Sequence, residues 1–489
     1  MTPSATAPAD ATQQQAPAPP KSGLDRFFRI SERGSSISRE VRGGLATFFA
    51  MAYILVLNPI ILGAGEDKYH HHLDNAQLVT ATALMAGLTT LLMGVIGNVP
   101  IALAAGLGIN AVVSLQLAPK MSWPDAMGMV VLAGLVLMLL VASGLRQRVM
   151  DAIPGGLRRA IAIGIGLFIA LIGLVDSGFV TRNPDKADTT VPMALGVAGR
   201  LHGWPVLVFV LGLALTFVLV VRKTRGAILI GMATMTVVAV VINAVANIPD
   251  LSWGLTVPNV PDKVVATPDF GLIGHISLFG GFHEVGILTG CLFVFTVLLS
   301  GFFDAMGTII GVGEEAGLTD KRGQLPGMGR ILMVDGVAVA GGGFGSASAN
   351  TCFVESTAGV GEGARTGFAN VVTGGLFLLA LIFTPLAKVV PSQAATPALV
   401  VVGFLIMAAN VKEIDWSDFT IAVPAFLTMV SMPFTYSITN GIGLGVLSYL
   451  LLRIATKRTR EVPWLLSVVG LCFLVYFLLD PIQQVIGTG

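Results

Sequence analysis

The fold is decided by the stretch Gly341-Gly342-Gly343-Phe344-Gly345-Ser346-Ala347-Ser348-Ala349-Asn350-Thr351-Cys352-Phe353-Val354-Glu355-Ser356, which places a carboxylic acid between long apolar runs. A charged side chain at the centre of a bilayer costs roughly 2.5–3.5 kcal/mol on insertion scales. Gly and Ser favour backbone that breaks or extends, which membrane proteins tolerate where the backbone lines a cavity. Glu355 beside a broken helix therefore predicts a solute site inside a membrane protein.

The whole chain has the composition of an integral membrane protein. Its 489 residues are 54% hydrophobic and 12% charged, with a mean hydropathy of +0.82. About a quarter of the residues are charged in an ordinary soluble domain. Uncharged runs long enough to cross a hydrocarbon core of ~30 Å recur along the sequence. The net charge of +1 gives no field that would attract nucleic acid.

We predict an all-α polytopic protein of the plasma membrane with about fourteen spans. They are expected at 44–63, 77–97, 102–118, 126–145, 157–175, 204–221, 227–246, 286–309, 328–344, 348–361, 368–387, 396–410, 418–434 and 437–453. A further apolar stretch, 463–479, lies in a C-terminal segment, 456–489. Residues 1–24 are expected to form a disordered cytoplasmic tail. A cytoplasmic N-terminus puts every Lys and Arg cluster of the loops on the inner side.

The chain also divides into two similar halves. The first repeat is expected at 25–250 and the second at 286–455, with an extracellular loop at 251–285 between them. Gly-rich interruptions occur at matching ranks, 104–110 and 341–356. Seven spans per half is an odd number, so the halves enter the membrane in opposite senses. Inverted repeats with broken helices at corresponding positions are typical of secondary transporters.

The third span contains Ala104-Ala105-Gly106-Leu107-Gly108-Ile109-Asn110-Ala111. Glycines such as Gly108 permit close backbone approach, and the Asn110 amide offers both a donor and an acceptor. These features fit a binding site. They fit equally well the packing of helices through small residues, which is common in membranes.

Two acids are the strongest candidates for chemistry. Asp304 follows an apolar run that begins near 286, and the alternative is a position near the cytoplasmic mouth. Glu355 has Thr351 and Ser356 beside it, and the alternative is an acid buried in packing. We interpret Asp335, early in the ninth span, as structural. A carboxylate in a low-dielectric cavity can accept hydrogen bonds from the N–H edge of a heterocycle or take up a proton.

The sequence around these residues resembles the AzgA-like purine permeases of the nucleobase–cation symporter (xanthine/uracil permease) family. The resemblance covers nearly everything after residue 24. It rests on 44–59, on 106–111, on Phe303-Asp304-Ala305-Met306-Gly307-Thr308, on Glu355-Ser356-Thr357-Ala358-Gly359 and on 362–367.

This resemblance implies two inverted repeats of seven spans, split into a core and a gate domain, with short extended segments in spans 3 and 10. It implies proton-coupled uptake of adenine, guanine or hypoxanthine. Asp304 and Glu355 would be the site carboxylates, one for the purine and one for the proton, with Asn110 as their polar partner. We add to the expected substrate site three residues beside them in the sequence: Gly108, Thr351 and Ser356.

The chain departs from the pattern of many such permeases at Gly301, where they carry a second acid, and at Ala305, where Thr is usual. The purine preference is therefore left open, as is a homodimer. An anion transporter or channel on the same general fold is the alternative, although two acids oppose an anion. No nucleophile–base pair indicates an enzyme, and no sequence pattern predicts a cofactor or metal.

Overall fold

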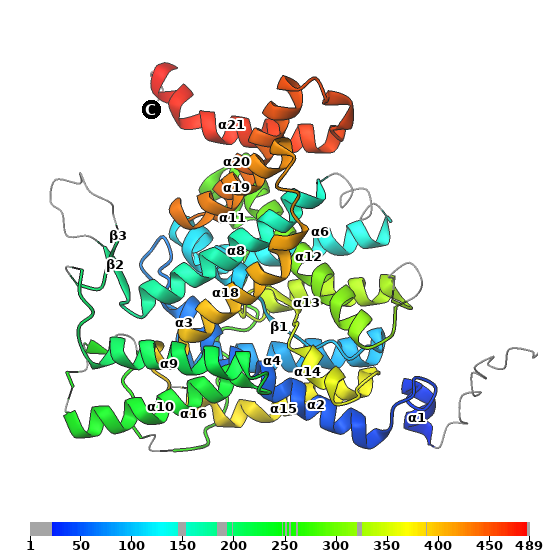
Figure 1. Cartoon of the computed structure of the whole chain (residues 1–489), viewed down its shortest axis with the longest axis vertical. Coiled ribbons are helices and arrows are strands. Elements are labelled where there is room, and N and C mark those ends of the chain that lie inside the picture. The colour runs from blue at the N-terminus through cyan, green and yellow to red at the C-terminus, as the bar shows by residue number, and fades with distance from the viewer. Residues whose placement is uncertain are drawn as a thin grey trace, which may run out of the picture.

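The computed structural model describes residues 22–144, 153–182, 193–387 and 389–486, apart from 198, 247, 250–251, 254–255, 261–262 and 320–324. Side chains at 303, 304, 306, 307, 310 and 479–486 are also outside the description. The expected tail at 1–24 falls almost entirely outside these ranges. Most of the described chain is helical, and most of the long helices run between the same two ends of the molecule (Figure 1).

The first half of the chain begins with the short helix α1 (Gly23–Phe28) and a first span that is broken in two. Its elements are α2 (Ile37–Met51), α3 (Ile54–Gly63), α4 (Asn75–Leu92), β1 (Leu103–Ala105), α5 (Leu107–Val112), α6 (Trp123–Ala142), α8 (Gly155–Asp176), α9 (Trp204–Val221) and α10 (Ala227–Ala246). A small antiparallel pair, β2 (Val180–Arg182) and β3 (Met193–Leu195), follows α8.

The second half follows the short helix α11 (Gly280–Val285) and repeats this order. Its elements are α12 (Ile287–Glu315), α13 (Met328–Phe344), β4 (Asn350–Cys352), α14 (Ser356–Gly361), α15 (Gly367–Ala380), α16 (Thr384–Ala387), α17 (Ser392–Ala395), α18 (Pro397–Asn410), α19 (Phe419–Phe434), α20 (Ile438–Ala455) and α21 (Trp464–Ile486).

The helices confirm the predicted class of an all-α polytopic membrane protein. Within the described residues, nine helices are long and apolar enough to cross a bilayer, and three more apolar helices are shorter. Several begin at a polar cap that accepts a backbone N–H: Asp74 from Gln77 (3.0 Å) and Ser437 from Asn440 (3.2 Å). The repeat boundaries near 250 and 286 stay predictions.

The observed elements differ from the predicted spans in two places and add detail in two others. The first span is interrupted between Met51 and Ile54, and the eighth continues to Glu315. The Gly-rich run remains helical as far as Phe344, because its glycines pack closely against neighbouring helices and strands. The stretch predicted at 463–479 is a helix, α21, which lies at the top of the molecule in Figure 1 and runs from right to left across it.

The extended segments predicted in spans 3 and 10 are confirmed, and they pair with each other. β1 and β4 are antiparallel, with Leu103 opposite Cys352 and Ala105 opposite Asn350. Two further backbone bonds of 2.9 Å extend the ladder, from Gly106 N to Ala349 O and from Phe353 N to Ala102 O. Both strands are fully buried. Each broken span thus satisfies the backbone groups of the other, as a low-dielectric environment requires.

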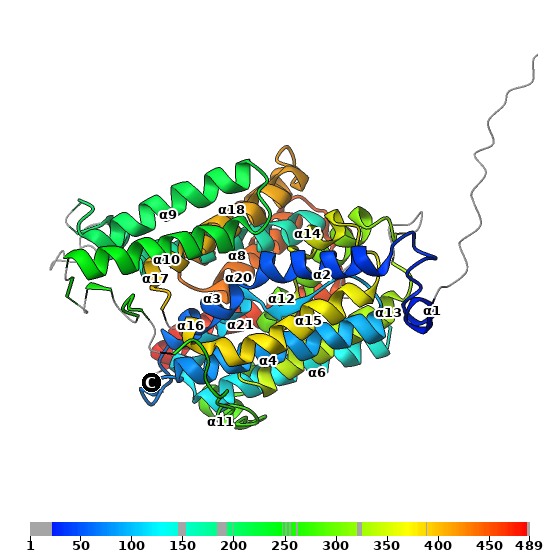
Figure 2. The ribbon, with the colours of Figure 1, turned by 90° about the horizontal axis from the view of Figure 1, so that it is seen from below.

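The helices form two groups, which match the predicted core and gate domains. In the core group, α13 packs on α6, and α15 packs on α2 and α4. In the gate group, α18 packs on α8 and α9, and α19 packs on α8 and α20. Figure 2 shows α9, α10 and α18 along one side of the molecule and α4, α6 and α15 along the other. The strand pair belongs to the core group, where β4 contacts α13 and β1 contacts α4.

Candidate functional site

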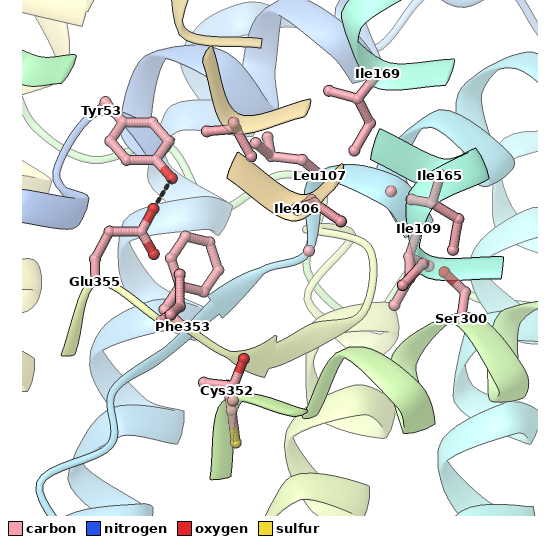
Figure 3. A pocket seen from close by; sticks show the side chains of 16 residues that line it. Tyr53, Leu107, Ile109, Ile165, Ile169, Ser300, Cys352, Phe353, Glu355 and Ile406 are labelled. Atoms are coloured by element: carbon pink, nitrogen blue, oxygen red, sulfur yellow. Dashed lines mark hydrogen bonds between the residues drawn. The ribbon is translucent and has the colours of Figure 1, made fainter. Parts of the chain in front are cut away.

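A cavity of about 100 Å³ lies where the core group meets the gate group. A cavity measured in this way holds one water molecule at about 10–15 Å³, so a cavity of this size has room for a small solute. Its wall comes from the first-span break, the start of α5, α8, α12, the segment from β4 to α14, and α18. Ile109, Ile165, Ile169, Phe353 and Ile406 make much of this wall apolar (Figure 3).

Glu355 lines this cavity, and its predicted role in binding a solute stays a prediction. It is the residue that directly precedes α14, three positions after β4 ends. Its carboxylate accepts a hydrogen bond from the hydroxyl of Tyr53, shown by the dashed line in Figure 3. The alternative interpretation, an acid enclosed in packing with no chamber beside it, does not describe this position, because Glu355 lines the cavity.

Tyr53 is a site residue that sequence reasoning missed. It occupies the break between α2 and α3, lines the cavity and is 1% exposed. Its hydroxyl in a largely apolar first span was the one signal available. The contact with Glu355 joins residues 302 positions apart, so no local pattern could reveal it.

The third span reaches the cavity through its glycines. Gly106 and Gly108 both line it. A Cβ at Gly106 would lie 2.7 Å from Thr351 Cγ2, and a Cβ at Gly108 would lie 2.6 Å from Ile165 Cγ2 on α8. Real Cβ atoms do not approach so closely. Gly106 therefore lets the third span approach β4, and Gly108 lets it approach the gate helix α8.

Three other predicted residues are buried beside the cavity but do not line it. Ser356 Oγ accepts a hydrogen bond from Ala102 N (3.0 Å), which ties α14 to the start of β1. Neither amide atom of Asn110 has a hydrogen-bond partner among the described residues, and the same holds for Thr351 Oγ1. All three side chains are at most 1% exposed. Their placement favours support of the broken spans over direct contact with a solute.

Asp304 lies in α12, and its side chain is outside the description. Ser300 and Thr308 on the same helix both line the cavity. Position 304 is four residues from each of them, and residues four apart share one face of an α-helix. The helical register is therefore compatible with the predicted placement of Asp304 beside the cavity. Contact between the two acids stays a prediction.

Asp335, interpreted from the sequence as structural, is 1% exposed and accepts a hydrogen bond from the thiol of Cys352 (3.6 Å). Cys352 belongs to β4 and also lines the cavity. Asp335 is thus connected to the strand that carries the site. This contact is compatible with a supporting role behind the wall.

A model of the permease family matches residues 38–444 of the chain. The guanine/hypoxanthine permease PbuG of Bacillus subtilis (strain 168) is 38% identical over 461 residues, which are 93% of this chain and 99% of PbuG. The adenine permease AdeP of Escherichia coli (strain K12) is 36% identical over 455 residues, covering 92% of this chain and 95% of AdeP.

Among solved structures, the fold is similar to the transmembrane domain of a cyanobacterial bicarbonate transporter, BicA. The TM-score is 0.57 at 13% sequence identity, and the match covers 82% of this chain and 97% of that domain. Identity at this level indicates a shared fold and carries no information about the solute.

Proposed function

The chain belongs to the permease family, whose members are membrane transporters and not enzymes, and from this premise we propose that it imports purine nucleobases in symport with protons. The proposed site is the cavity that Glu355 lines between the core and gate groups. The proposed setting is the cell membrane, with the N-terminus in the cytoplasm. Guanine, hypoxanthine and adenine are the candidate substrates, since relatives over nearly the whole length are named for them.

The observation that carries the proposal is the position of the Glu355 carboxylate at a cavity with a largely apolar wall. A purine has apolar faces and a hydrogen-bonding edge. Side chains such as Ile165, Ile406 and Phe353 suit the faces, and the Glu355 carboxylate suits an N–H of the edge. Small-molecule sites usually combine an apolar lining with a few polar groups that fix orientation.

The position of the cavity supports alternating access. The core side of its wall comes from β4 and α5, and the gate side comes from α8 and α18. A movement of one group against the other would expose the same site to either side of the membrane in turn. Transport of this kind requires no change in the site itself.

Proton coupling is supported by the cost of a charged acid in a low-dielectric site, because this cost favours uptake of a proton by the carboxylate. We propose that Glu355 and Asp304 are the coupling residues, one holding the purine and the other taking the proton. The 311–317 stretch, Gly311-Val312-Gly313-Glu314-Glu315-Ala316-Gly317, lacks the Lys and Ser or Thr of a phosphate-binding loop. An ion gradient is therefore the proposed energy source.

Uptake of radiolabelled hypoxanthine in cells that lack their own purine uptake tests the function. We expect accumulation that a protonophore abolishes and that unlabelled guanine or adenine, but not uracil, competes away. Glu355→Gln should lower uptake about 10- to 100-fold, the range for a hydrogen bond to a charged group. Glu284→Gln, an exchange of the same kind on the outer surface, is the matched control. No accumulation of any nucleobase would refute the proposal.

The anion alternative has no observation in its favour beyond the shared fold. An anion site is expected to offer a cation or a helix N-terminus that is free of acids. Here Glu355 stands directly before α14 and at the cavity. Currents carried by bicarbonate or sulfate would contradict this conclusion.

A further inference from the structure

The hydroxyl of Tyr53 occupies a hydrogen-bonding position on the Glu355 carboxylate, at the wall of the cavity. Among the described side chains, Tyr53 is the donor to this carboxylate. A buried carboxylate without a donor is costly, and hydrogen bonds to charged groups are worth more than neutral ones. A substrate N–H needs the same carboxylate oxygens. The hydroxyl and the substrate therefore compete for one acceptor.

We propose that Tyr53 is a positioning residue that satisfies Glu355 in the empty carrier and yields its place to a substrate N–H. This inference rests on the proposed function. It predicts two opposite effects of the hydroxyl: it weakens substrate binding by competition, and it supports the return of the empty carrier across the membrane. The substrate class that can take its place is a planar base with an N–H on its ring edge.

The backbone around Tyr53 lets its side chain respond to the site. The first span is interrupted there: Leu55 N bonds to Ala52 O (3.1 Å) and Val56 N to Tyr53 O (3.0 Å), both three residues back instead of four. Pro59, inside α3, removes a further helical N–H. Two interruptions within one short helical stretch leave this part of the span less constrained than a continuous helix.

The first span also connects Tyr53 to both broken spans. α2 packs on α14 and α15, and α3 packs on α4, α5 and β1. Tyr53 lies between these two half-helices, so its hydroxyl joins the tenth-span acid to a segment that contacts the third span. Replacement of the hydroxyl by a substrate would alter a contact at the centre of the core group. This is a physical route from occupancy of the site to the arrangement of the core.

Tyr53→Phe, which keeps the ring and removes the hydroxyl, tests the proposal in purified protein and in proteoliposomes. Hypoxanthine should bind about 2- to 10-fold more tightly, because one neutral donor no longer competes. Net uptake should become slower. Exchange of internal for external labelled hypoxanthine, which needs no return of the empty carrier, should keep the wild-type rate. A purely structural defect would lower net uptake and exchange together.

Tyr449→Phe is the matched control, since Tyr449 is also buried (3% exposed) but lies on α20 beside Arg453, away from the cavity. It should leave binding, net uptake and exchange unchanged. In a Glu355→Gln background, Tyr53→Phe should leave hypoxanthine binding as weak as in Glu355→Gln alone, because the carboxylate for which the hydroxyl competes is absent. Unchanged binding and uptake in an active protein, or a joint loss of uptake and exchange, would overturn the role of Tyr53. A wild type that neither binds nor exchanges nucleobases would instead refute the proposed function.

Discussion

The two broken spans share one architecture but differ in chemistry. Each has a fully buried three-residue strand followed by a six-residue helix: β1 with α5, and β4 with α14. One residue, Gly106, separates strand from helix in the third span, whereas three residues ending in Glu355 separate them in the tenth. The tenth span also carries the polar strand residues Asn350 and Thr351. The scaffold is therefore shared by both halves, and the acid belongs to one.

This difference gives the two broken spans different roles. The third span contributes small residues that permit close contact, and the tenth span contributes the acid that we propose to bind the solute. The longer connection after β4 gives room for an acidic side chain at the cavity edge, while Gly106 leaves none because Thr351 is too close. Substitutions in the third span should therefore act through steric clashes, and substitutions in the tenth span through the loss of hydrogen bonds.

The largest loss of stability is expected from adding a side chain at a glycine that packs directly against backbone atoms. A Cβ at Gly342 would lie 2.1 Å from Ser348 O and 2.7 Å from Asn350 N, both backbone atoms next to β4. Gly342→Ala should destabilise the protein by about 3 kcal/mol or more, because the strand must move. Melting of the purified protein measures this. At Gly341 the nearest atom is the mobile end of Met85, at 3.2 Å, so Gly341→Ala should melt close to wild type.

A smaller loss of stability is expected from removing the hydrogen bond between Ala102 N and Ser356 Oγ, which helps to connect the two broken spans. Ser356→Ala removes the acceptor for Ala102 N–H and should cost about 1–3 kcal/mol, the penalty for an unsatisfied buried donor. The melting temperature should fall while hypoxanthine affinity stays near wild type. Thr357→Ala, at the adjacent half-buried position, is the control. A large loss of affinity at unchanged stability would instead restore Ser356 as a substrate contact.

Gly108→Ala probes the space-filling role of the third span. The new methyl group would lie 2.6 Å from Ile165 Cγ2, at the contact between α5 and the gate helix α8. Uptake should fall about 10-fold, equivalent to ~1.4 kcal/mol, with little change in stability. Gly311→Ala on α12, where a Cβ meets open space, should transport normally. Equal losses in both variants would show that glycine matters here for some reason other than space.

The smallest effect is expected outside the membrane. Glu284 accepts from Lys68 (2.5 Å) and from the Tyr69 hydroxyl (3.0 Å), and the hydrogen bond from Lys68 holds the pKa of Glu284 below its usual value. A lowered pKa stabilises the fold above the unfolded-state pKa, and this stability is lost as the pH falls through the folded pKa. Glu284→Gln should therefore melt slightly below wild type at pH 7. The difference should shrink as the pH falls below about 4.3, the ordinary pKa of Glu, and vanish below the lowered pKa of the folded protein. A difference that persists in stronger acid would assign it to packing.

Much of the fold could be predicted because hydropathy and glycine placement are local signals. The long apolar runs predicted the helices, and the Gly- and Ser-rich interruptions predicted the two extended segments that became β1 and β4. The break at Tyr53 was missed because the surrounding 48–57 stretch is apolar and contains neither Gly nor Pro. Only contacts with distant elements single out that position.

The site was predictable in part for the same reason. Glu355 and Gly108 were found because an acid and a glycine are conspicuous in apolar surroundings. Asn110, Thr351 and Ser356 have the same local signature, yet they do not line the cavity. Which way a buried polar side chain points depends on the packing of other spans, as the bond between Ser356 and Ala102 illustrates. The local sequence around these residues therefore does not predict which of them face the cavity.

The last helix has a practical consequence for work on this protein. α21 begins near the ion pair of Arg453 with Glu461, and its Tyr476 and Phe477 share a cleft with Lys68 and Glu284. A tag attached after α21 and a tag attached ahead of α1 would therefore lie on opposite sides of the molecule in Figure 1. Accessibility of the two tags to a protease in intact cells would test the proposed cytoplasmic N-terminus directly.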